Sequence, residues 1–477
     1  MSAYDTVVGL EVHIQLNTQS KAFCGDSIEF GASANTQVSA ISLAHPGTLP
    51  VANHTHVQKA IKLGLALGCE INTTHYFDRK HYFYPDLPKG YQITQDAQPI
   101  CIGGSLDIEV NGQKKAIRLH HIHMEEDAGK TIHDQHDTLS LVDLNRAGTP
   151  LMELVTEPDL SSGDEVFAFI TELQKILRYI GVSDADMEKG SMRCDCNVSI
   201  KPTGSSTLEE RCEIKNLNSR RFAREAVQYE AKRQIKMREG GVSFNKQTLH
   251  FDPDTGKTSV MREKEGVADY RYFPDPDLPP MTVSQADIDQ IKATLPEMPQ
   301  VVKAKLIADG LTEDYADQLT QSKDVVGYYE ELKIKTGDIK ATSNLIINQI
   351  LPSLREDQSI GEFGVPLDTC VTYLKLISDK KISASMAHQK LWPALLDQPQ
   401  NPEQLADKLG LLLKEDQGEL RDMITQILAD HPAQVKQYRG GKKALIGFFI
   451  GAAMKKSGGS FDPGQIKSAI TKALDDN

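Results

Sequence analysis

The sequence predicts an α+β protein in which a domain built on an antiparallel sheet is followed by two all-α domains. The N-terminal part is rich in short apolar runs punctuated by glycine and proline, with few helical stretches. Past Pro296 the pattern changes to Leu, Ile, Ala, Lys and Asp at helical spacing. A chain of 477 residues is also too long for one ordinary core. We therefore expect a sheet domain over 1–293, a helical domain over 294–402 and a helical tail domain over 403–477.

The first strand is predicted over residues 6–16, where every even position from Val8 to Leu16 is apolar. In a strand this alternation buries the even side chains and directs Glu11 and His13 together from the opposite face. A carboxylate and an imidazole on one surface can bind a divalent cation or transfer a proton. A solvated strand face fits the same pattern, so this segment alone leaves both interpretations open.

Three helices are expected in the first domain, each closed by a glycine, over residues 53–68, 162–180 and 219–239. Ser162 and Glu165 have the spacing of a capping box at the start of the second of them. A cluster of Pro and Gln over 398–402 marks the predicted end of the second domain. In the tail, the last helix is expected to begin at Asp462 and Pro463.

Composition excludes several classes of protein. Hydrophobic residues make up 39% of the chain, and no apolar run approaches the ~18 residues that cross a bilayer. The N-terminus shows no basic region followed by an apolar signal core. The seven cysteines are an odd number scattered over a long chain, which is unlike a disulfide framework. We expect free thiols, a cytoplasmic location and no membrane association.

Charge is distributed unevenly along the chain. A net charge of −13 argues against a protein that coats nucleic acid nonspecifically. Residues 436–472, however, carry eight Lys and Arg against the single acid Asp462. The tail therefore has a basic surface on an otherwise acidic protein.

Three polar segments carry groups that could bind a cation. Residues 120–130 begin as a strand and include three consecutive acids, whose oxygens suit Mg²⁺ or Ca²⁺, although a charged turn fits as well. Glu153 lies in an apolar run, where an unpaired buried carboxylate would cost several kcal/mol, so it faces either a cation or solvent. Asp195 and Glu213 each lie two residues before another polar residue, so in a strand each acid and that residue would project from the same face.

Cys194 and Cys196 have no second cysteine pair near them, which favours structural thiols over a soft-metal site. Residues 77–91 and 269–280 interleave aromatic side chains with cations and prolines. Such segments either stack bases and hold phosphates or form rigid packing between sheets, and the sequence leaves this choice open. The chain has no Walker A loop and no G-x-G-x-x-G turn, so any nucleotide would be held by a different cradle.

Taken in order, these motifs resemble the GatB family, the B subunits of aspartyl/glutamyl-tRNA(Asn/Gln) amidotransferases. The segments that carry the resemblance are 8–13, 82–93, 123–130, 143–151, 213–219, 269–274, 440–445 and 451–455. The resemblance implies a ligase that amidates a misacylated tRNA with Mg²⁺ and ATP as co-substrate. It also implies a heterotrimer: the A subunit, a glutaminase, supplies ammonia through a channel, and the small C subunit ties A and B together. The first domain would then be the catalytic cradle, acting as kinase and transamidase.

By position, the resemblance implies that His13, Glu153 and one of Glu125 or Glu126 hold the Mg²⁺ of the reaction centre. Strand parity from His121 and His123 favours Glu125, unless the strand ends before it. Ligands of a second cation nearby would be Glu11, Asp195 and Glu213. Weaker candidates for phosphate binding, from charge and position, are Arg79, Lys80, Arg146 and Lys215. Candidates for tRNA binding in the tail are Lys436, Arg439, Lys442, Lys443, Lys455 and Lys456.

The chain departs from the family pattern at one place. Many members carry a zinc site built from C-x-C and C-x-x-C, where this chain has Cys24, Asp26, Ser39 and Ser42. One thiol, one carboxylate and two hydroxyls make a poor zinc site, so no zinc is expected.

Two other functions fit parts of the sequence. The first is a tRNA-binding scaffold of the same fold that has no catalytic activity. Seven ionisable groups at the positions that resemble the family's metal ligands argue against it. A metal-dependent phosphotransferase acting on a small carboxylate is the other, and the basic tail weighs against that. Glu-tRNA(Gln), Asp-tRNA(Asn) or both fit as substrates.

Overall fold

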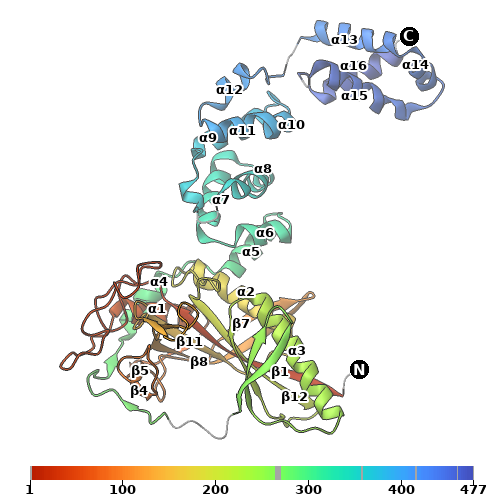
Figure 1. Cartoon of the computed structure of the whole chain (residues 1–477). Coiled ribbons are helices and arrows are strands. Elements are labelled where there is room, and N and C mark those ends of the chain that lie inside the picture. The colour runs from red at the N-terminus through yellow and green to blue at the C-terminus, as the bar shows by residue number, and fades with distance from the viewer. Residues whose placement is uncertain (1–2, 264–269, 356–357, 414–415, 459, 476–477) are drawn as a thin grey trace. The chain divides into compact units, whose positions relative to one another are not determined.

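The computed structural model describes residues 3–263, 270–355, 358–413, 416–458 and 460–475. The chain forms two compact units, Met1–Pro299 and Gln300–Asn477 (Figure 1). Strands and a few helices build the first unit, and helices build the second. The predicted α+β class is therefore confirmed. Among the described residues, no helix combines the length and the apolar character needed to span a bilayer.

In its described residues, the first unit is built on one large sheet and three small ones. The strands of the large sheet are β1 (Tyr4–Gln15), β2 (Glu70–Ile71), β6 (Cys101–Ile102), β7 (Ser105–Val110), β8 (Gln113–Glu126), β11 (Pro150–Thr156), β12 (Met192–Pro202), β13 (Cys212–Leu217), β14 (Gln247–Asp252) and β15 (Lys257–Glu263). Their order is β15-β14-β13-β12-β1-β11-β8-β6-β2, with β7 paired to β8. The small sheets consist of β3 (Thr74–His75) with β17 (Met281–Thr282), β9 (Lys130–Ile132) with β10 (Leu141–Asp143), and β16 (Phe273–Pro274) with β4 (Asp78–His81) and β5 (Tyr91–Thr94).

The large sheet is antiparallel as predicted except for one parallel pair. Strands β13 and β14 run parallel, whereas the other pairs that the structure describes are antiparallel. Helix α3 (Arg220–Glu239) connects β13 to β14. Parallel neighbours need such a crossover, because a short hairpin cannot return the chain to the same end of the sheet.

The three helices predicted in the first domain are present as α1 (His54–Ala66), α2 (Gly163–Tyr179) and α3, followed by α4 (Gln285–Ala293). Ser162 Oγ accepts a hydrogen bond from Glu165 N at 3.2 Å, as a cap should. The Glu165 carboxylate, however, accepts from Ser161 N at 2.8 Å rather than from Ser162 N. The predicted capping box is therefore only half formed.

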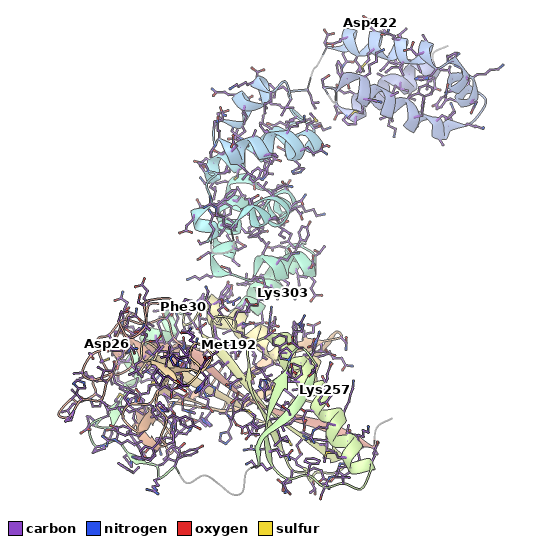
Figure 2. The ribbon with its side chains drawn as sticks, in the orientation of Figure 1. Asp26, Phe30, Met192, Lys257, Lys303 and Asp422 are labelled. Atoms are coloured by element: carbon purple, nitrogen blue, oxygen red, sulfur yellow. The ribbon has the colours of Figure 1, made fainter. Side chains whose placement is uncertain are left out.

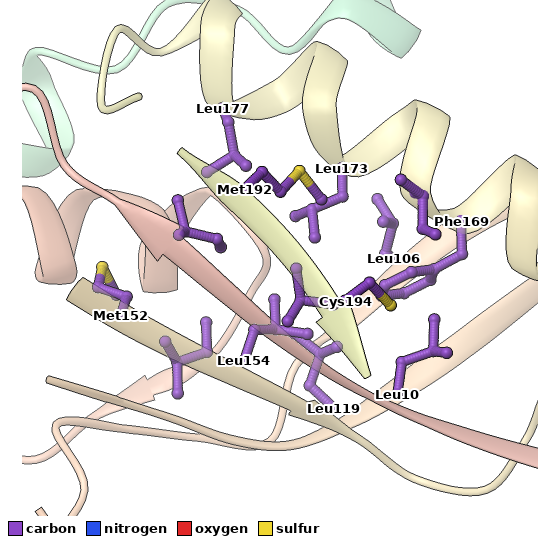
Figure 3. Packing of buried hydrophobic residues seen from close by; sticks show 14 of the residues in the cluster. Leu10, Leu106, Leu119, Met152, Leu154, Phe169, Leu173, Leu177, Met192 and Cys194 are labelled. Carbon is purple, nitrogen blue, oxygen red and sulfur yellow. The ribbon is translucent and has the colours of Figure 1, made fainter. Parts of the chain in front are cut away.

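Helices α2 and α3 cover one face of the large sheet, and the even residues of β1 are buried beneath them. Val8, Leu10, Val12 and Ile14 are at most 1% exposed. Figure 3 shows Leu10 and Cys194 in the layer that meets α2. Both Cys194 and the neighbouring Cys196 of β12 are fully buried in this core, which agrees with structural thiols. The odd residues of β1 project from the opposite face.

Gly163 marks the close approach of α2 to α3. A Cβ at this position would lie 2.4 Å from the backbone oxygen of Arg224. We therefore expect Gly163→Ala to lower the free energy of unfolding by about 1–3 kcal/mol, because the backbone must shift. Urea unfolding measures this. Gly327→Ala, inside the exposed surface of α7 (Lys323–Thr336), is the control, since its Cβ would meet nothing within 4 Å. An equal loss in both variants would contradict the account.

The second unit contains two hydrophobic cores, one between Val302 and Leu411 and one between Leu420 and Leu474. The helices around the first are α5 (Pro299–Ala308), α6 (Glu313–Leu319), α7, α8 (Ile339–Leu345), α9 (Leu367–Ser378), α10 (Ala384–Met386), α11 (Trp392–Asp397) and α12 (Pro402–Lys408), with π or 3-10 turns at Ile346–Ile350, Leu351–Ser353, Ile360–Glu362 and Ala387–Leu391. Those around the second are α13 (Gln417–Asp430), α14 (Pro432–Arg439), α15 (Ile446–Ser457) and α16 (Pro463–Asp475), with a 3-10 turn at Lys443–Leu445.

The boundary predicted after residue 402 does not coincide with the division between these cores. Leu405 and Leu411 pack in the first core, so the helical domain extends past the Pro and Gln cluster. The reason is local: Asn401 Oδ1 caps α12 through Glu403 N at 3.0 Å, and Pro402 is the first residue of the helix. The cluster starts a helix instead of ending a domain.

Candidate functional site

The site lies on the face of the large sheet opposite α2. There the four neighbouring strands β12, β1, β11 and β8 place polar residues directly opposite one another. His13 of β1 is paired with Glu153 of β11 on one side and with Arg193 of β12 on the other. Glu153 is in turn paired with His123 of β8. Directly opposed residues project from the same face with Cβ atoms about 4.5–5.5 Å apart. Strand pairing therefore gathers residues that are far apart in the sequence.

The first group comprises His13, Glu125 and Glu153, each with a possible ligand atom within 4.8 Å of those of the other two. His13 Nε2 lies 3.2 Å from Glu153 Oε2 and 3.6 Å from Glu125 Oε1. Two carboxylates and one imidazole can supply three ligands to a divalent cation, with oxygen predominating as Mg²⁺ prefers. The donor set therefore fits the ion that the resemblance implies.

Glu126 does not belong to this group. Its Oε1 accepts hydrogen bonds from Lys89 Nζ and, at 2.9 Å, from Ile93 N. Strand β8 continues through Glu126, so adjacent residues alternate between faces and only Glu125 shares the face of His123. The parity argument for Glu125 thus agrees with the geometry.

The second group comprises Glu11, Asp195 and Glu213, again with ligand atoms within 4.8 Å of one another. Glu11 and Asp195 are directly paired across β1 and β12. A register shift between Cys194 and Cys196 lies beside Asn216, whose φ is 58°. Asn216 N donates to Asp195 Oδ1 at 2.9 Å. Three carboxylates form an all-oxygen set, which also suits Mg²⁺ or Ca²⁺.

The carboxylates of the first group favour the protonated forms of His13 and His123 and raise the pKa of both. Burial disfavours the charged form of His13, but Glu153 and Glu125 outweigh it and raise the pKa of His13 to about 9. Burial opposes the charge of Glu153 as well, yet His123, His13 and Lys80 together depress the pKa of Glu153. A cation at this position must displace the proton of His13, so its affinity should increase as the pH rises toward 9.

In the second group, Lys215 supplies the positive charge. Lys215 Nζ lies 2.8 Å from Asp195 Oδ2 and 2.7 Å from Glu213 Oε1. Burial disfavours the ammonium, but the two carboxylates overcome this and raise the pKa of Lys215. Burial and the neighbouring acids raise the pKa of Glu11. Lys215 therefore occupies the place of a counter-ion between two of the three carboxylates.

We expect Lys215→Met to strengthen divalent-cation binding at the second group, because the competing ammonium is removed. Without added cation, the same variant should lose about 1–3 kcal/mol of stability, since two buried carboxylates lose a partner. Calorimetric titration with Ca²⁺ and urea unfolding measure the two effects. Lys257→Met, on the exposed strand β15, is the control. Weaker cation binding in Lys215→Met would contradict this competition.

Two of the residues proposed for phosphate binding, Arg79 and Arg146, have partners within the protein. Arg79 donates to Asp275 at 2.9 Å and to Asp277 at 2.7 Å. Arg146 donates to two backbone carbonyl oxygens and lies 3.6 Å from Asp127. These hydrogen bonds of the two guanidinium groups hold loops together.

Lys80 is differently placed. It forms no ion pair with any residue that the structure describes. Burial disfavours its charge, but Glu125 and Glu153 prevail and raise the pKa of Lys80. Its Nζ lies instead over aromatic rings, 5.0 Å from the ring centroid of Tyr270 and 5.9 Å from that of Tyr82.

Two residues of the site went unassigned at the level of sequence. His123 Nε2 lies 3.6 Å from Glu153 Oε2 and 3.7 Å from Glu125 Oε2. Arg193 donates to Asp127 at 2.9 Å beside His13. The parity of His123 with Glu125 was a usable signal, whereas Arg193 required knowledge of which strands are neighbours.

The six basic residues proposed for the tail all have exposed side chains: Lys436, Arg439, Lys442, Lys443, Lys455 and Lys456. They lie on α14, on α15 and on the turn between these helices. Lys443 Nζ is 3.3 Å from Asp475 Oδ1 and lies 4.1 Å from the ring centroid of Tyr438. The structure therefore presents a basic surface on this helical core.

The four positions that replace a zinc site meet in one loop. Asp26 Oδ2 accepts from Ser39 N at 2.9 Å and from Ser42 Oγ, and Cys24 Sγ lies 3.5 Å from Ser42 Oγ. The fully buried Lys21 places its ammonium 3.9 Å from Asp26 Oδ2. A cation already faces the only carboxylate of the set, so the donors do not fit Zn²⁺.

Elemental analysis of the purified protein is therefore expected to find no stoichiometric zinc. Dialysis against a chelator should leave the unfolding midpoint unchanged, because hydrogen bonds and the ammonium of Lys21 hold this loop. One zinc per chain that survives chelation would contradict the expectation.

Comparison with known proteins agrees with these observations. A family model described as the GatB/GatE catalytic domain matches residues 6–289, and one described as the GatB domain matches residues 327–474. The chain is similar to the B subunit of the aspartyl/glutamyl-tRNA(Asn/Gln) amidotransferase from Chlorobium chlorochromatii, at 42% identity over 99% of both chains. It is 44% identical to the protein of the same name from a Wolbachia of Brugia malayi, over 99% of this chain and 98% of that protein.

Proposed function

The chain belongs to the GatB family, and from that premise we propose that it is the B subunit of a glutamine-dependent tRNA amidotransferase. The substrate would be Glu-tRNA(Gln), Asp-tRNA(Asn) or both, and the products would be the amidated tRNAs. The observation that carries this proposal is the pair of three-ligand groups side by side on one sheet face, joined through Glu11 and His13 of a single strand.

The reaction has two steps. An oxygen of the side-chain carboxylate attacks the γ-phosphorus of ATP, which breaks the bond to ADP and forms an acyl phosphate. The nitrogen of ammonia then attacks the carbonyl carbon, phosphate leaves, and a proton is released as the amide forms. Both steps build negative charge on phosphate oxygens, and a bound Mg²⁺ would neutralise it.

The residues of the site would divide this work. His13, Glu125 and Glu153 would hold Mg²⁺ at the reaction centre, while Glu11, Asp195 and Glu213 would hold a second cation. Side chains two apart on β1 are about 6.6–6.8 Å apart along the strand, so the strand itself sets the spacing between the two groups. Lys80 would bind the transferred phosphoryl group.

The remaining parts would be supplied by partners and by the tail. Ammonia would come from glutamine hydrolysed by the glutaminase partner, the A subunit, and would reach this chain through an internal channel. The C subunit would complete a heterotrimer in the cytoplasm. The exposed Lys and Arg of the tail would contact tRNA phosphates.

Reconstitution tests the proposal. The chain is combined with the A and C subunits, glutamine, ATP, Mg²⁺ and each misacylated tRNA, and the amino acid released from the tRNA is identified. We expect Gln or Asn that depends on ATP and Mg²⁺. tRNA binding without amide formation on either substrate would contradict the proposal and would favour an inactive scaffold.

A further inference from the structure

The two aromatic segments that the sequence left open are brought together by one small sheet. Strand β16 pairs with β4, with Phe273 opposite Arg79. Just beyond this pairing, His81 N donates to the backbone oxygen of Tyr270 at 2.9 Å. The segments 82–84 and 270–273 therefore form a single surface, although they are far apart in the sequence.

Four tyrosines on this surface form a continuous row: Tyr84, Tyr82, Tyr270 and Tyr272. Successive ring centroids are 5.9, 6.2 and 6.1 Å apart, in edge-to-face contact. We call these residues the tyrosine row. Contacts of this kind keep each ring in a defined orientation.

The inner side of the tyrosine row lies beside the first ligand group. Lys80 Nζ is 5.0 Å from the ring centroid of Tyr270 and 5.9 Å from that of Tyr82. Tyr82 Oη donates to Gln92 Oε1 at 3.3 Å, and Gln92 Nε2 donates to the backbone oxygen of Glu126 at 2.8 Å. The tyrosine row is therefore joined to the end of β8 that carries Glu125 of the first group.

The outer side of the surface is open to solvent. Phe83 is 85% exposed and Tyr84 is 59% exposed, and Phe273 at 44% and Tyr272 at 38% are exposed as well. The Phe83 ring rests against Gly90, where an added Cβ would lie 3.0 Å from Phe83 Cε1. These rings contribute little to the core, and exposing a group of large aromatic side chains is unfavourable unless a partner covers them.

Exposed aromatic rings next to cations are the means by which proteins bind unpaired nucleotides, because every base has a face that can stack. We propose that Phe83, Tyr84 and the tyrosine row bind the unpaired nucleotides at the 3′ end of an aminoacylated RNA. The acyl group at that end would then reach the reaction centre past Lys80. This inference rests on the proposed function, because it identifies the part of the tRNA that the same site holds.

The open shape of the surface favours an RNA end over the adenine of ATP. A small nucleotide is usually enclosed by a pocket that buries most of its surface. A strand end that is tethered by the rest of the RNA is already held near the surface, so open stacking on a few rings suffices.

Fluorescence binding with the full-length chain tests this inference. The probe is an RNA minihelix with an unpaired 3′ end that carries 2-aminopurine as its last base. The Phe83→Ala/Tyr84→Ala variant should bind it about 5- to 100-fold more weakly and lose the change in fluorescence. Tyr84→Phe keeps the ring and should behave as wild type. Phe30→Ala is the matched control, since Phe30 is an exposed aromatic at 75% in the same unit (Figure 2).

Unchanged affinity of the double variant for the RNA probe would overturn the inference. Weaker binding of a fluorescent ATP analogue by the same variant, with RNA binding unaffected, would overturn it as well. The two proposals fail separately. A chain that stacks the probe through Phe83 and Tyr84 but forms no amide loses only its proposed enzymatic function. Normal amidation together with undiminished probe binding by the double variant would refute only the stacking surface.

Discussion

Replacing Glu153 with glutamine is expected to lower the rate of amide formation by about 100- to 1000-fold at saturating substrates. Glu153 Oε2 lies 3.2 Å from His13 Nε2 and 3.6 Å from His123 Nε2, so this carboxylate is the centre of the first group. Glutamine keeps the shape of the side chain but removes its charge. The site would then lose a ligand for Mg²⁺ and the main counter-charge of His13.

Two measurements separate the lost metal ligand from the lost counter-charge. The rate of amide formation is measured against Mg²⁺ concentration, and metal binding is titrated directly with Mn²⁺ as a spectroscopic substitute. The variant should need more metal and should not reach the wild-type rate. The pKa of His13, about 9 in the wild type, should fall, because Glu153 is its largest favourable influence. Glu109→Gln, on the exposed edge of β7, should leave all three quantities unchanged. Full activity with unaltered metal affinity in Glu153→Gln would remove Glu153 from the metal site.

Ending the chain after Leu413 is expected to weaken tRNA binding by about tenfold or more while leaving amide formation at saturating tRNA intact. The truncation removes the core between Leu420 and Leu474 together with all six basic residues proposed for the tail. It retains Leu405 and Leu411, which a cut after residue 402 would have taken from the preceding core. The loss is electrostatic, because each Lys or Arg on a phosphate releases counterions.

Filter binding over a range of salt concentrations measures the effect. The truncated chain should show both a higher Kd and a smaller dependence of log Kd on log salt, since each lost contact reduces that slope by about 0.7–0.9. Replacing the exposed Lys340 of α8 by Ala is the control for a basic residue outside the tail. Equal affinity and equal salt slope before and after truncation would show that the tail does not contact tRNA.

Local patterns sufficed for the fold class and for most elements near the site. The alternation over β1 and the capping residue Ser162 are properties of residues close together in the sequence, and they correctly predicted a strand and a helix. Asn401 shows the limit of such signals. The same Asn-Pro pair that ends a domain in one context begins a helix here, and burial of Leu405 decided between them.

For the candidate site, local sequence patterns predicted which side chains share a strand face, whereas long-range strand pairing brought those side chains close together. Strand parity placed Glu11 and His13 on one face and separated Glu125 from Glu126, because successive strand side chains alternate by covalent geometry alone. Parity cannot say which strand lies next to which, because register depends on long-range pairing. Only that pairing put Glu153 opposite His13 and Asp195 opposite Glu11. It also brought Lys215 against Asp195 and joined the two aromatic segments into one surface, contacts that no local pattern encodes.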